Sequence, residues 1–268
     1  MSKEPLSTIK AISFDAGHTL LRATPSITHH YREVLKKAGS RKSPSQIDLI
    51  VTDTLETFER KMFQEDLMNE ASDDKEKARW AQVDQVIARK AEVTEDPKSV
   101  ADQIWERFLN PDHWEPYPET ERVLGVLRKS GYKVGVLSNW STGLRAVLAY
   151  HKLEPLLDFT IISAEVGIQK PSAKIFQLAA MKAGVPIENL LHVGDQPEAD
   201  FHGARAAGAK AALVGRQRAE GVDDDMVLGN LREIFMILWE DRYGRYGKRR
   251  KPQDAEGQRE VLRMWGEE

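Results

Sequence analysis

The chain has 268 residues, no cysteine and a formal net charge of −3. The lack of cysteine excludes disulfides, thiolate catalysis and cysteine-bound metals, and the small net charge gives no general attraction to nucleic acid. With 41% hydrophobic and 30% charged residues, the composition is that of a soluble globular protein. Because no apolar run reaches the roughly 18 residues of a membrane span and no signal-peptide pattern follows Met1, we expect a cytoplasmic protein without a membrane partner.

The first element expected along the chain is a buried strand and its following turn, within residues 8–21. The apolar run 11–14 ends at Asp15, and the small residues Ala16 and Gly17 come next. A carboxylate at the end of a buried strand can be presented to a substrate as a nucleophile. Asp15 is therefore the first candidate catalytic residue.

Residues 24–112 contain no convincing strand and show apolar residues at helical spacing instead. The two clearest series are Ile47, Ile50, Val51, Leu55 and Phe58, and Trp80, Val83, Val86 and Ile87. We interpret the charged residues 73–77 as a solvated stretch between helices, and Asp96-Pro97 or Ser99 as the start of the last helix. The block predicts an inserted, all-α cap domain.

From residue 116 onward, helices and short apolar strands alternate. The expected strands are residues 133–137, 159–163, 190–193 and 211–214, and the expected helices are 120–130, 141–151, 172–183, 200–207 and 228–239. Glycine directly follows three of these helices, at positions 131, 184 and 208, as is common at helix C-termini. The alternation predicts an α/β core with a parallel sheet covered on both faces.

These patterns divide the chain into three regions. The assignment is residues 1–23 and 113–240 for the α/β core domain, 24–112 for the helical cap domain and 241–268 for a basic C-terminal tail. Dense basic runs at a chain end are most often solvated. We therefore do not expect nucleic acid as a partner of the tail.

Polar residues follow several of the expected strands. In chain order they are Asp15, Ser138, Asn139, Lys170, Asp195 and Asp200. In an open parallel sheet, ligands bind beyond the carboxyl ends of the strands, so these groups are expected to converge. Phosphoryl transfer needs such a set, because a carboxylate nucleophile approaches a phosphate only when positive charge lies beside both.

Each residue type suits a role in that reaction. Asp195 and Asp200, together with Asp15, offer the hard oxygen ligands that Mg²⁺ prefers. The Ser138 hydroxyl and the Asn139 backbone N–H are suited to holding phosphoryl oxygens. Lys170 is expected to balance the charge that develops during transfer.

The order of these residues resembles the haloacid dehalogenase superfamily over roughly residues 9–215. The matching motifs are the Asp at position 15 with Thr19, the strand-end Ser138, Lys170 before a proline, and Gly-Asp-x-x-x-x-Asp over residues 194–200. The resemblance implies a Rossmann-like, flavodoxin-like sheet with a C1-type helical cap, Mg²⁺ as cofactor and an aspartyl-phosphate intermediate. It also implies that the backbone carbonyl of Gly17 is a metal ligand.

The departure from the family pattern is Gly17, where phosphatases of the family carry the acid/base Asp. Two branches with other chemistry also lack that Asp. The 2-haloacid dehalogenases are metal-independent and lack the Gly-Asp-x-x-x-x-Asp motif that this chain keeps. Phosphonoacetaldehyde hydrolases use a Schiff-base lysine in the cap, for which the possible candidates are Lys36, Lys37, Lys42 and Lys61. A third branch resembles residues 138–144, Ser-Asn-Trp-Ser-Thr-Gly-Leu, and fits best.

His18 allows two interpretations. It is either a bulky residue accommodated in the turn or a substitute general acid, since histidine titrates near neutrality.

We expect a Mg²⁺-dependent phosphohydrolase for a small phosphorylated substrate, weak on alkyl phosphates because it lacks the usual acid. The alternatives are a phosphonatase- or dehalogenase-type hydrolase, and a binding or interaction module with little catalysis.

Overall fold

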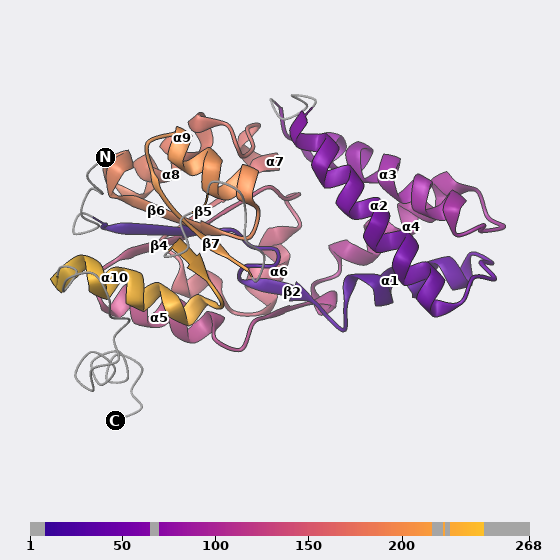
Figure 1. Ribbon diagram of the computed structural model, residues 1–268, viewed down its shortest axis with the longest axis horizontal. Helices are drawn as coiled ribbons and strands as arrows, with labels where there is room; N and C mark the ends of the chain where they lie inside the picture. The colour runs from indigo at the N-terminus through magenta and orange to yellow at the C-terminus, as the bar shows by residue number, and fades with distance from the viewer. Residues whose placement is uncertain (1–8, 65–69, 216–221, 223–225, 244–268) are drawn as a thin grey trace.

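The computed structural model describes residues 9–64, 70–215, 222 and 226–243. Figure 1 shows two lobes: a sheet with helices on both of its faces, and a separate lobe built only of helices. The α/β architecture predicted from the sequence is confirmed. No helix in the described ranges is both long and apolar enough to cross a membrane.

The larger lobe is organised around a six-stranded sheet in the order β5-β4-β1-β6-β7-β8, in which every neighbouring pair is parallel. Its strands are β1 (Ala11–Phe14), β4 (Lys133–Ser138), β5 (Phe159–Ile162), β6 (Leu190–Gly194), β7 (Lys210–Val214) and β8 (Val227–Leu228). Strand β1 is buried along its whole length, which explains its continuous apolar sequence.

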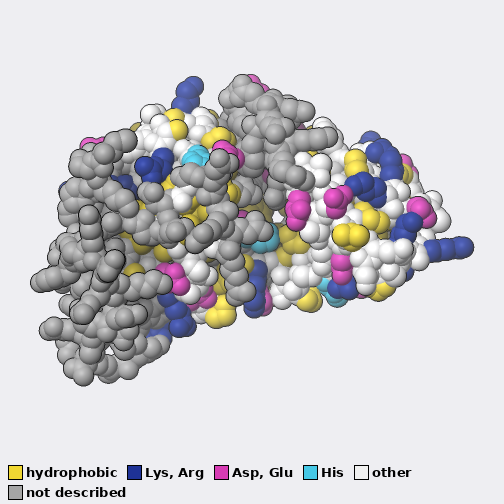
Figure 2. All heavy atoms as spheres, viewed as in Figure 1, with side chains coloured by type: hydrophobic (Ala, Val, Ile, Leu, Met, Phe, Trp, Pro, Cys, Tyr) yellow, Lys and Arg dark blue, Asp and Glu magenta, His cyan; other side chains and the backbone are white. Residues whose placement is uncertain are grey.

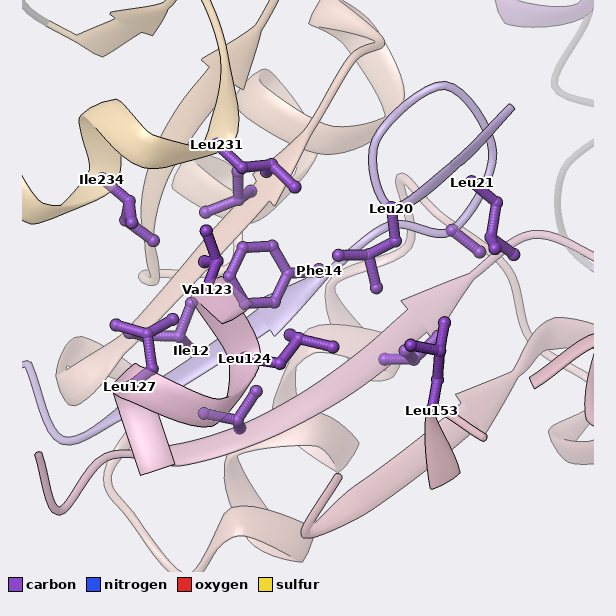
Figure 3. Packing of buried hydrophobic residues seen from close by; sticks show 14 of the residues in the cluster. Ile12, Phe14, Leu20, Leu21, Val123, Leu124, Leu127, Leu153, Leu231 and Ile234 are labelled. Atoms are coloured by element: carbon purple, nitrogen blue, oxygen red, sulfur yellow. The ribbon is translucent and has the colours of Figure 1, made fainter. Parts of the chain in front are cut away.

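Helices cover both faces of this sheet, with α5 and α10 on one side and α8 and α9 on the other (Figure 1). The helices of this lobe are α5 (Thr120–Lys129), α6 (Leu144–Tyr150), α7 (Ser163–Val166), α8 (Ala173–Ala183), α9 (Gly203–Ala206) and α10 (Ile234–Tyr243). Each face has its own hydrophobic cluster. Figure 3 shows Phe14 of β1 surrounded by Val123 and Leu124 of α5 and by Leu231.

The helical lobe consists of α1 (Ile27–Lys37), α2 (Pro44–Gln64), α3 (Asp73–Lys90) and α4 (Pro97–Leu109). These helices share a third hydrophobic cluster that is formed within the lobe. Helix α4 begins as predicted, with Asp96 at the N-cap and Pro97 in the first turn. On the face seen in Figure 2, acidic and basic side chains are interspersed over this lobe.

Residues 73–77 were expected to be a solvated stretch, and that expectation is wrong. They form the first turn of α3, whose N-cap is Ser72, and Glu76 is buried. Acidic residues stabilise a helix N-terminus through its macrodipole, so a charged run is compatible with a helix start.

The two lobes are joined by a pair of short antiparallel strands, β2 (Leu21–Ala23) and β3 (Trp114–Pro116). The domain boundaries proposed at residues 23/24 and 112/113 fall beside these strands and stay a prediction. The part of the basic tail over residues 244–268 lies outside the described residues.

Two local expectations in the core are also corrected. Residues 197–202 form a π-helical turn before the short helix α9, in place of a single helix over 200–207. Val227–Leu228 extends the sheet as β8, and the last helix begins at Ile234. In this short apolar segment, the sequence pattern does not separate a buried strand from a helix start.

Candidate active site

The predicted site residues are placed at one edge of the sheet by three neighbouring parallel strands. Strand β1 ends directly before Asp15, β4 ends at Ser138, and β6 ends directly before Asp195. Because β1 pairs with β4 on one side and β6 on the other, their carboxyl ends lie next to one another. The Asp15 backbone N–H continues this pairing by donating to the Val193 carbonyl at 2.8 Å.

Lys170 connects two of the carboxylates. Its Nζ donates to Asp15 Oδ1 at 2.6 Å and to Asp200 Oδ1 at 2.5 Å. The lysine is only 2% exposed, so both ion pairs are removed from water, where charge-assisted hydrogen bonds are strong. The structure therefore holds a buried ammonium directly beside the strand-end aspartate.

The carboxylates of Asp15, Asp195 and Asp200 gather closely enough to hold a cation, since one oxygen from each lies within 4.8 Å of the others. Burial raises the pKa of Asp195 well above its ordinary value, and the charges of Asp15 and Asp200 raise it further. Thr19 Oγ1 donates to Asp195 at 3.4 Å. Crowded carboxylates with insufficient positive charge are the environment that a hard divalent cation stabilises.

The ionisable groups around Lys170 shift one another's pKa values. Burial and the charge of Asp200 raise the pKa of Asp15, while Lys170 opposes them, and the net shift is upward. Burial also works against the charged form of Lys170, but the carboxylates of Asp15 and Asp200 outweigh it and raise the lysine pKa. For Asp200, burial is outweighed by Lys170 and by the hydrogen bond from His192, so its pKa is lowered. An ionised Asp200 thus holds a charged Lys170.

Ser138 and Asn139 differ in what they touch. The Ser138 hydroxyl lies near Asp15 and acts to lower the pKa of that carboxyl. Asn139 instead forms two bonds to the backbone of Lys170, with Nδ2 donating to its carbonyl at 2.9 Å and Oδ1 accepting from its N–H at 2.8 Å. The Asn139 side chain therefore positions the lysine, which leaves its backbone N–H as the group suited to a phosphate.

His18 lies in the turn after Asp15 with φ of 54°, in the left-handed region. The residue is exposed, yet neighbouring atoms crowd its imidazole, and this desolvation lowers its pKa although the charge of Asp15 works in the opposite direction. The neutral ring that results has no acidic proton to give at pH 7.

Sequence reasoning missed a buried polar pair beneath the site. His192 Nε2 lies 3.0 Å from Asp200 Oδ1, and its Nδ1 lies 2.9 Å from Ser13 Oγ. Ser13 and His192 are register partners on β1 and β6. The available signal was one polar residue inside each of two apolar strands. The pair fixes the carboxylate that in turn fixes Lys170.

A parallel α/β domain with a strand-end aspartate, a buried lysine and further acidic residues at one sheet edge, joined to a helical lobe, is the architecture of haloacid dehalogenase-type hydrolases. The chain belongs to this family, because the sequence model described as haloacid dehalogenase-like hydrolase matches residues 9–208.

Curated relatives have both phosphatase names and general family names. A phosphoserine phosphatase of Thermus thermophilus is 37% identical over 146 residues, covering 51% of this chain and 57% of that protein. The haloacid dehalogenase-like hydrolase domain-containing protein 3 of Mus musculus is 36% identical over 43% of this chain and 46% of its own length. The chain thus spans about half the length of these two relatives.

Solved structures resemble the whole fold. The HAD-hydrolase YfnB of Bacillus subtilis has a TM-score of 0.68 at 14% sequence identity, covering 86% of this chain and 98% of that one. At this level of identity the likeness shows a shared fold, a Rossmann-like core with a helical cap.

Proposed function

We propose that the protein is a Mg²⁺-dependent phosphohydrolase that acts through an aspartyl-phosphate on Asp15. The observation that supports this most is the buried Lys170 ammonium held between Asp15 and Asp200, because an anionic nucleophile and a phosphate need fixed positive charge between them. The phosphatase names of two relatives point the same way: the Thermus protein and a glyceraldehyde 3-phosphate phosphatase of Methanopyrus kandleri, 35% identical over 121 residues.

The proposed reaction has two steps. A carboxylate oxygen of Asp15 attacks phosphorus, and the bond from phosphorus to the leaving oxygen breaks with its electron pair departing on that oxygen. Water then hydrolyses the acyl phosphate, which releases inorganic phosphate and restores the carboxylate. In both steps Lys170, the Ser138 hydroxyl and the Asn139 backbone N–H stabilise negative charge on the phosphoryl oxygens.

The acidic cluster fits Mg²⁺ in the nature and number of its oxygen donors. Asp15, Asp195 and the Gly17 carbonyl would hold the ion, with Asp200 beside them. When bound, the cation neutralises charge between the carboxylates and the phosphate. Asp200 also positions Lys170. Its two carboxylate oxygens accept hydrogen bonds from Lys170, His192 and the Gln196 N–H. The related YfnB structure was solved with magnesium bound.

The absence of a carboxylate at residue 17 sets the range of leaving groups. A general acid contributes about 10²–10⁴-fold when the leaving oxygen is strongly basic. We therefore expect slow turnover of alkyl phosphates and faster turnover of esters with weakly basic leaving groups. His18 is the candidate substitute, although its lowered pKa disfavours proton donation.

The phosphonatase alternative requires a cap lysine in the site, and two of the candidates instead make contacts within the cap. Lys36 Nζ donates to the Ser40 carbonyl at 3.4 Å, and Lys42 forms an ion pair with Glu92 at 2.5 Å. Lys37 is exposed on α1, and the side chain of Lys61 lies outside the described residues. These contacts favour the phosphatase hypothesis over the phosphonatase one.

The test is phosphate release from p-nitrophenyl phosphate with Mg²⁺ and after EDTA treatment. Asp15→Asn should lower kcat at least about 10³-fold because it removes the nucleophile, and EDTA should abolish turnover reversibly. Glu121→Gln, an exposed change on α5, serves as the matched control and should keep full activity. His18→Asn, which tolerates the left-handed backbone, should cost less than about tenfold.

Other results would replace the proposal. Metal-independent halide release from a 2-haloacid without phosphate release would make the protein a dehalogenase. Borohydride trapping of a cap lysine with phosphonoacetaldehyde would make it a phosphonatase. Phosphate release that is unchanged in Asp15→Asn would contradict the enzyme mechanism and favour the interaction module.

A further inference from the structure

Trp140 is held firmly at the end of β4, directly after Ser138 and Asn139. Its backbone N–H donates to Ser163 Oγ at 3.0 Å, and its carbonyl accepts from Ser163 Oγ at 3.2 Å and from the Ala164 N–H at 3.3 Å. Its indole meets the buried Trp114 ring edge to face, with centroids 4.6 Å apart. Both the backbone and the ring of Trp140 are therefore fixed.

The indole of Trp140 also covers Gly17. A Cβ atom added to Gly17 would lie 3.2 Å from Trp140 Cζ3 and 3.9 Å from Cη2. The φ angle of Gly17 is not in the left-handed region, so its backbone conformation does not require glycine. The space next to it is tight, because a side chain at this position would press on the indole, which would have to shift by a few tenths of an ångström.

The ring of Trp140 lies beside residue 17, and residue 17 is two positions after the proposed nucleophile. The ring can therefore affect how the leaving group departs. A carboxylate there would be the group that protonates the leaving oxygen. In this chain the apolar benzo ring of the Trp140 indole lies next to that position. The leaving group would meet an aromatic surface in place of a proton donor.

We infer that Trp140 is a specificity-determining residue that directs the enzyme to aryl phosphate monoesters. This inference rests on the proposed phosphohydrolase activity. Asp15 forms a bond to phosphorus while the aryl C–O–P linkage breaks at its P–O bond, and the electron pair leaves on a phenoxide that later takes a proton from solvent. A phenoxide, whose conjugate acid has a pKa of about 10, departs without the acid that an alkoxide needs. Its ring offers an apolar face that packs against indole.

The direct test compares phenyl phosphate with glycerol 2-phosphate in Trp140→Leu and Trp140→Phe. Removing the aromatic face should lower kcat/KM for phenyl phosphate about 5- to 10-fold, mainly through KM, while the value for glycerol 2-phosphate changes less than about twofold. Trp140→Phe should keep most of the aryl preference. Equal losses on both substrates in Trp140→Leu, or a Trp140→Phe variant as impaired as Trp140→Leu, would overturn the inference.

A double variant tests whether the indole excludes the acid. Gly17→Asp alone should lower turnover of both substrates, because the new carboxylate and Trp140 compete for one space. Gly17→Asp combined with Trp140→Ala should raise turnover of glycerol 2-phosphate at least about tenfold over Trp140→Ala. If Gly17→Asp raises alkyl-phosphate turnover with Trp140 in place, the indole does not occupy the acid position and the inference fails.

These outcomes are separate from failure of the proposed function. If phosphate release from every substrate ignores Asp15→Asn, the phosphohydrolase proposal fails. If release depends on Asp15 but the Trp140 variants treat aryl and alkyl esters alike, only the inference about Trp140 fails. Circular dichroism of each variant, with Trp140→Phe as the mildest change, verifies that the fold is kept.

Discussion

Asp84 is a carboxyl group buried in the helical cap, where only 1% of the residue is exposed. Its Oδ1 accepts a hydrogen bond from the Tyr31 hydroxyl at 2.6 Å. Burial raises its pKa to about 7, against an opposing effect of the Tyr31 hydrogen bond. A carboxyl group whose pKa is higher in the folded than in the unfolded chain contributes stability that is fully present below the unfolded value, 3.8, and is lost as pH rises through the folded value.

We therefore predict that Asp84→Asn reduces the pH dependence of cap stability. Between pH 5 and pH 8 this carboxyl should cost the wild type about 2–3 kcal/mol of its free energy of unfolding, an amount that the amide variant does not lose. Urea denaturation at the two pH values measures the difference. Asp74→Asn, at an exposed position of the same helix, is the control and should follow the wild type. A wild type and Asp84→Asn with parallel pH profiles would contradict the assigned burial cost.

Sequence spacing predicted which residues meet at the sheet edge but not how they contact one another. Asp15 directly follows β1, whereas Lys170 and Asp200 lie in the connections after β5 and β6. Parallel strands bring residues that follow their carboxyl ends together whatever their separation in the chain. The pairing of His192 with Ser13 joins residues 179 positions apart. This contact depends on the register of β1 and β6 in the sheet, so no local sequence pattern predicts the pairing of His192 with Ser13. The contact of Trp140 with Gly17 is equally non-local.

At the scale of elements, the first turn of α3 is where the cap touches the core loops. The Asp73 carboxylate accepts from the Thr142 N–H at 2.7 Å and from its hydroxyl at 2.5 Å. One turn further on, Arg79 donates to Gln169, the residue before Lys170, at 3.1 Å. Helix α3 thus contacts both loops that carry proposed phosphate-binding groups.

We predict that Asp73→Ala loosens the loop after β4. A hydrogen bond of this kind is worth about 0.5–1.5 kcal/mol, so amide exchange at Thr142 should accelerate about 2- to 10-fold. Exchange at Trp140, whose N–H bonds to Ser163 within the core, should stay unchanged. Hydrogen exchange followed by mass spectrometry or NMR measures both sites. Asp74→Ala in the same turn is the control, and acceleration there equal to that of Asp73→Ala would show a general fraying of α3.

Element types were largely predictable because hydrophobic periodicity and glycine caps are local signals. The failures have local causes too. In the π-helical turn 197–202, the Asp200 carboxylate accepts the Gln196 N–H at 2.9 Å. The turn is thus tied to a site side chain, and a Cβ on Gly194 would collide with Asp200. The run 73–77 was misassigned because its charges suggested a loop, although acidic residues also favour the start of a helix.

At the scale of the whole molecule, the chain passes between the lobes at β2 and β3, which pair with each other. Beside this junction, Ile27 and Phe108 pack against both the cap cluster and a core cluster. An inserted cap was predictable, since a helical block separates the first strand from the rest. The contact of α3 with core loops was not, because it depends on how the two lobes are placed.

Cation binding offers the last prediction, since its proposed ligands tie together distant parts of the core. Asp15 follows β1, whereas Asp195 and Asp200 follow β6. The site therefore exists only in the folded chain. A ligand that binds only the folded state adds about 2.7 kcal/mol at 100 times its Kd, which corresponds to about 5–10 °C in Tm for a chain of this size. Calorimetric melting with increasing Mg²⁺ should show this rise in the wild type.

Asp195→Asn should abolish the rise in Tm, because it removes a proposed ligand. Without Mg²⁺ the same variant should melt no lower than the wild type, since the lost charge was crowded by Asp15 and Asp200. Glu198→Gln, an exposed change in the adjacent turn, should keep the full response. A Mg²⁺ response of Asp195→Asn equal to that of the wild type would place the cation elsewhere. A lower Tm of this variant in EDTA would mean that the Asp195 carboxylate stabilises the fold by itself, without a metal.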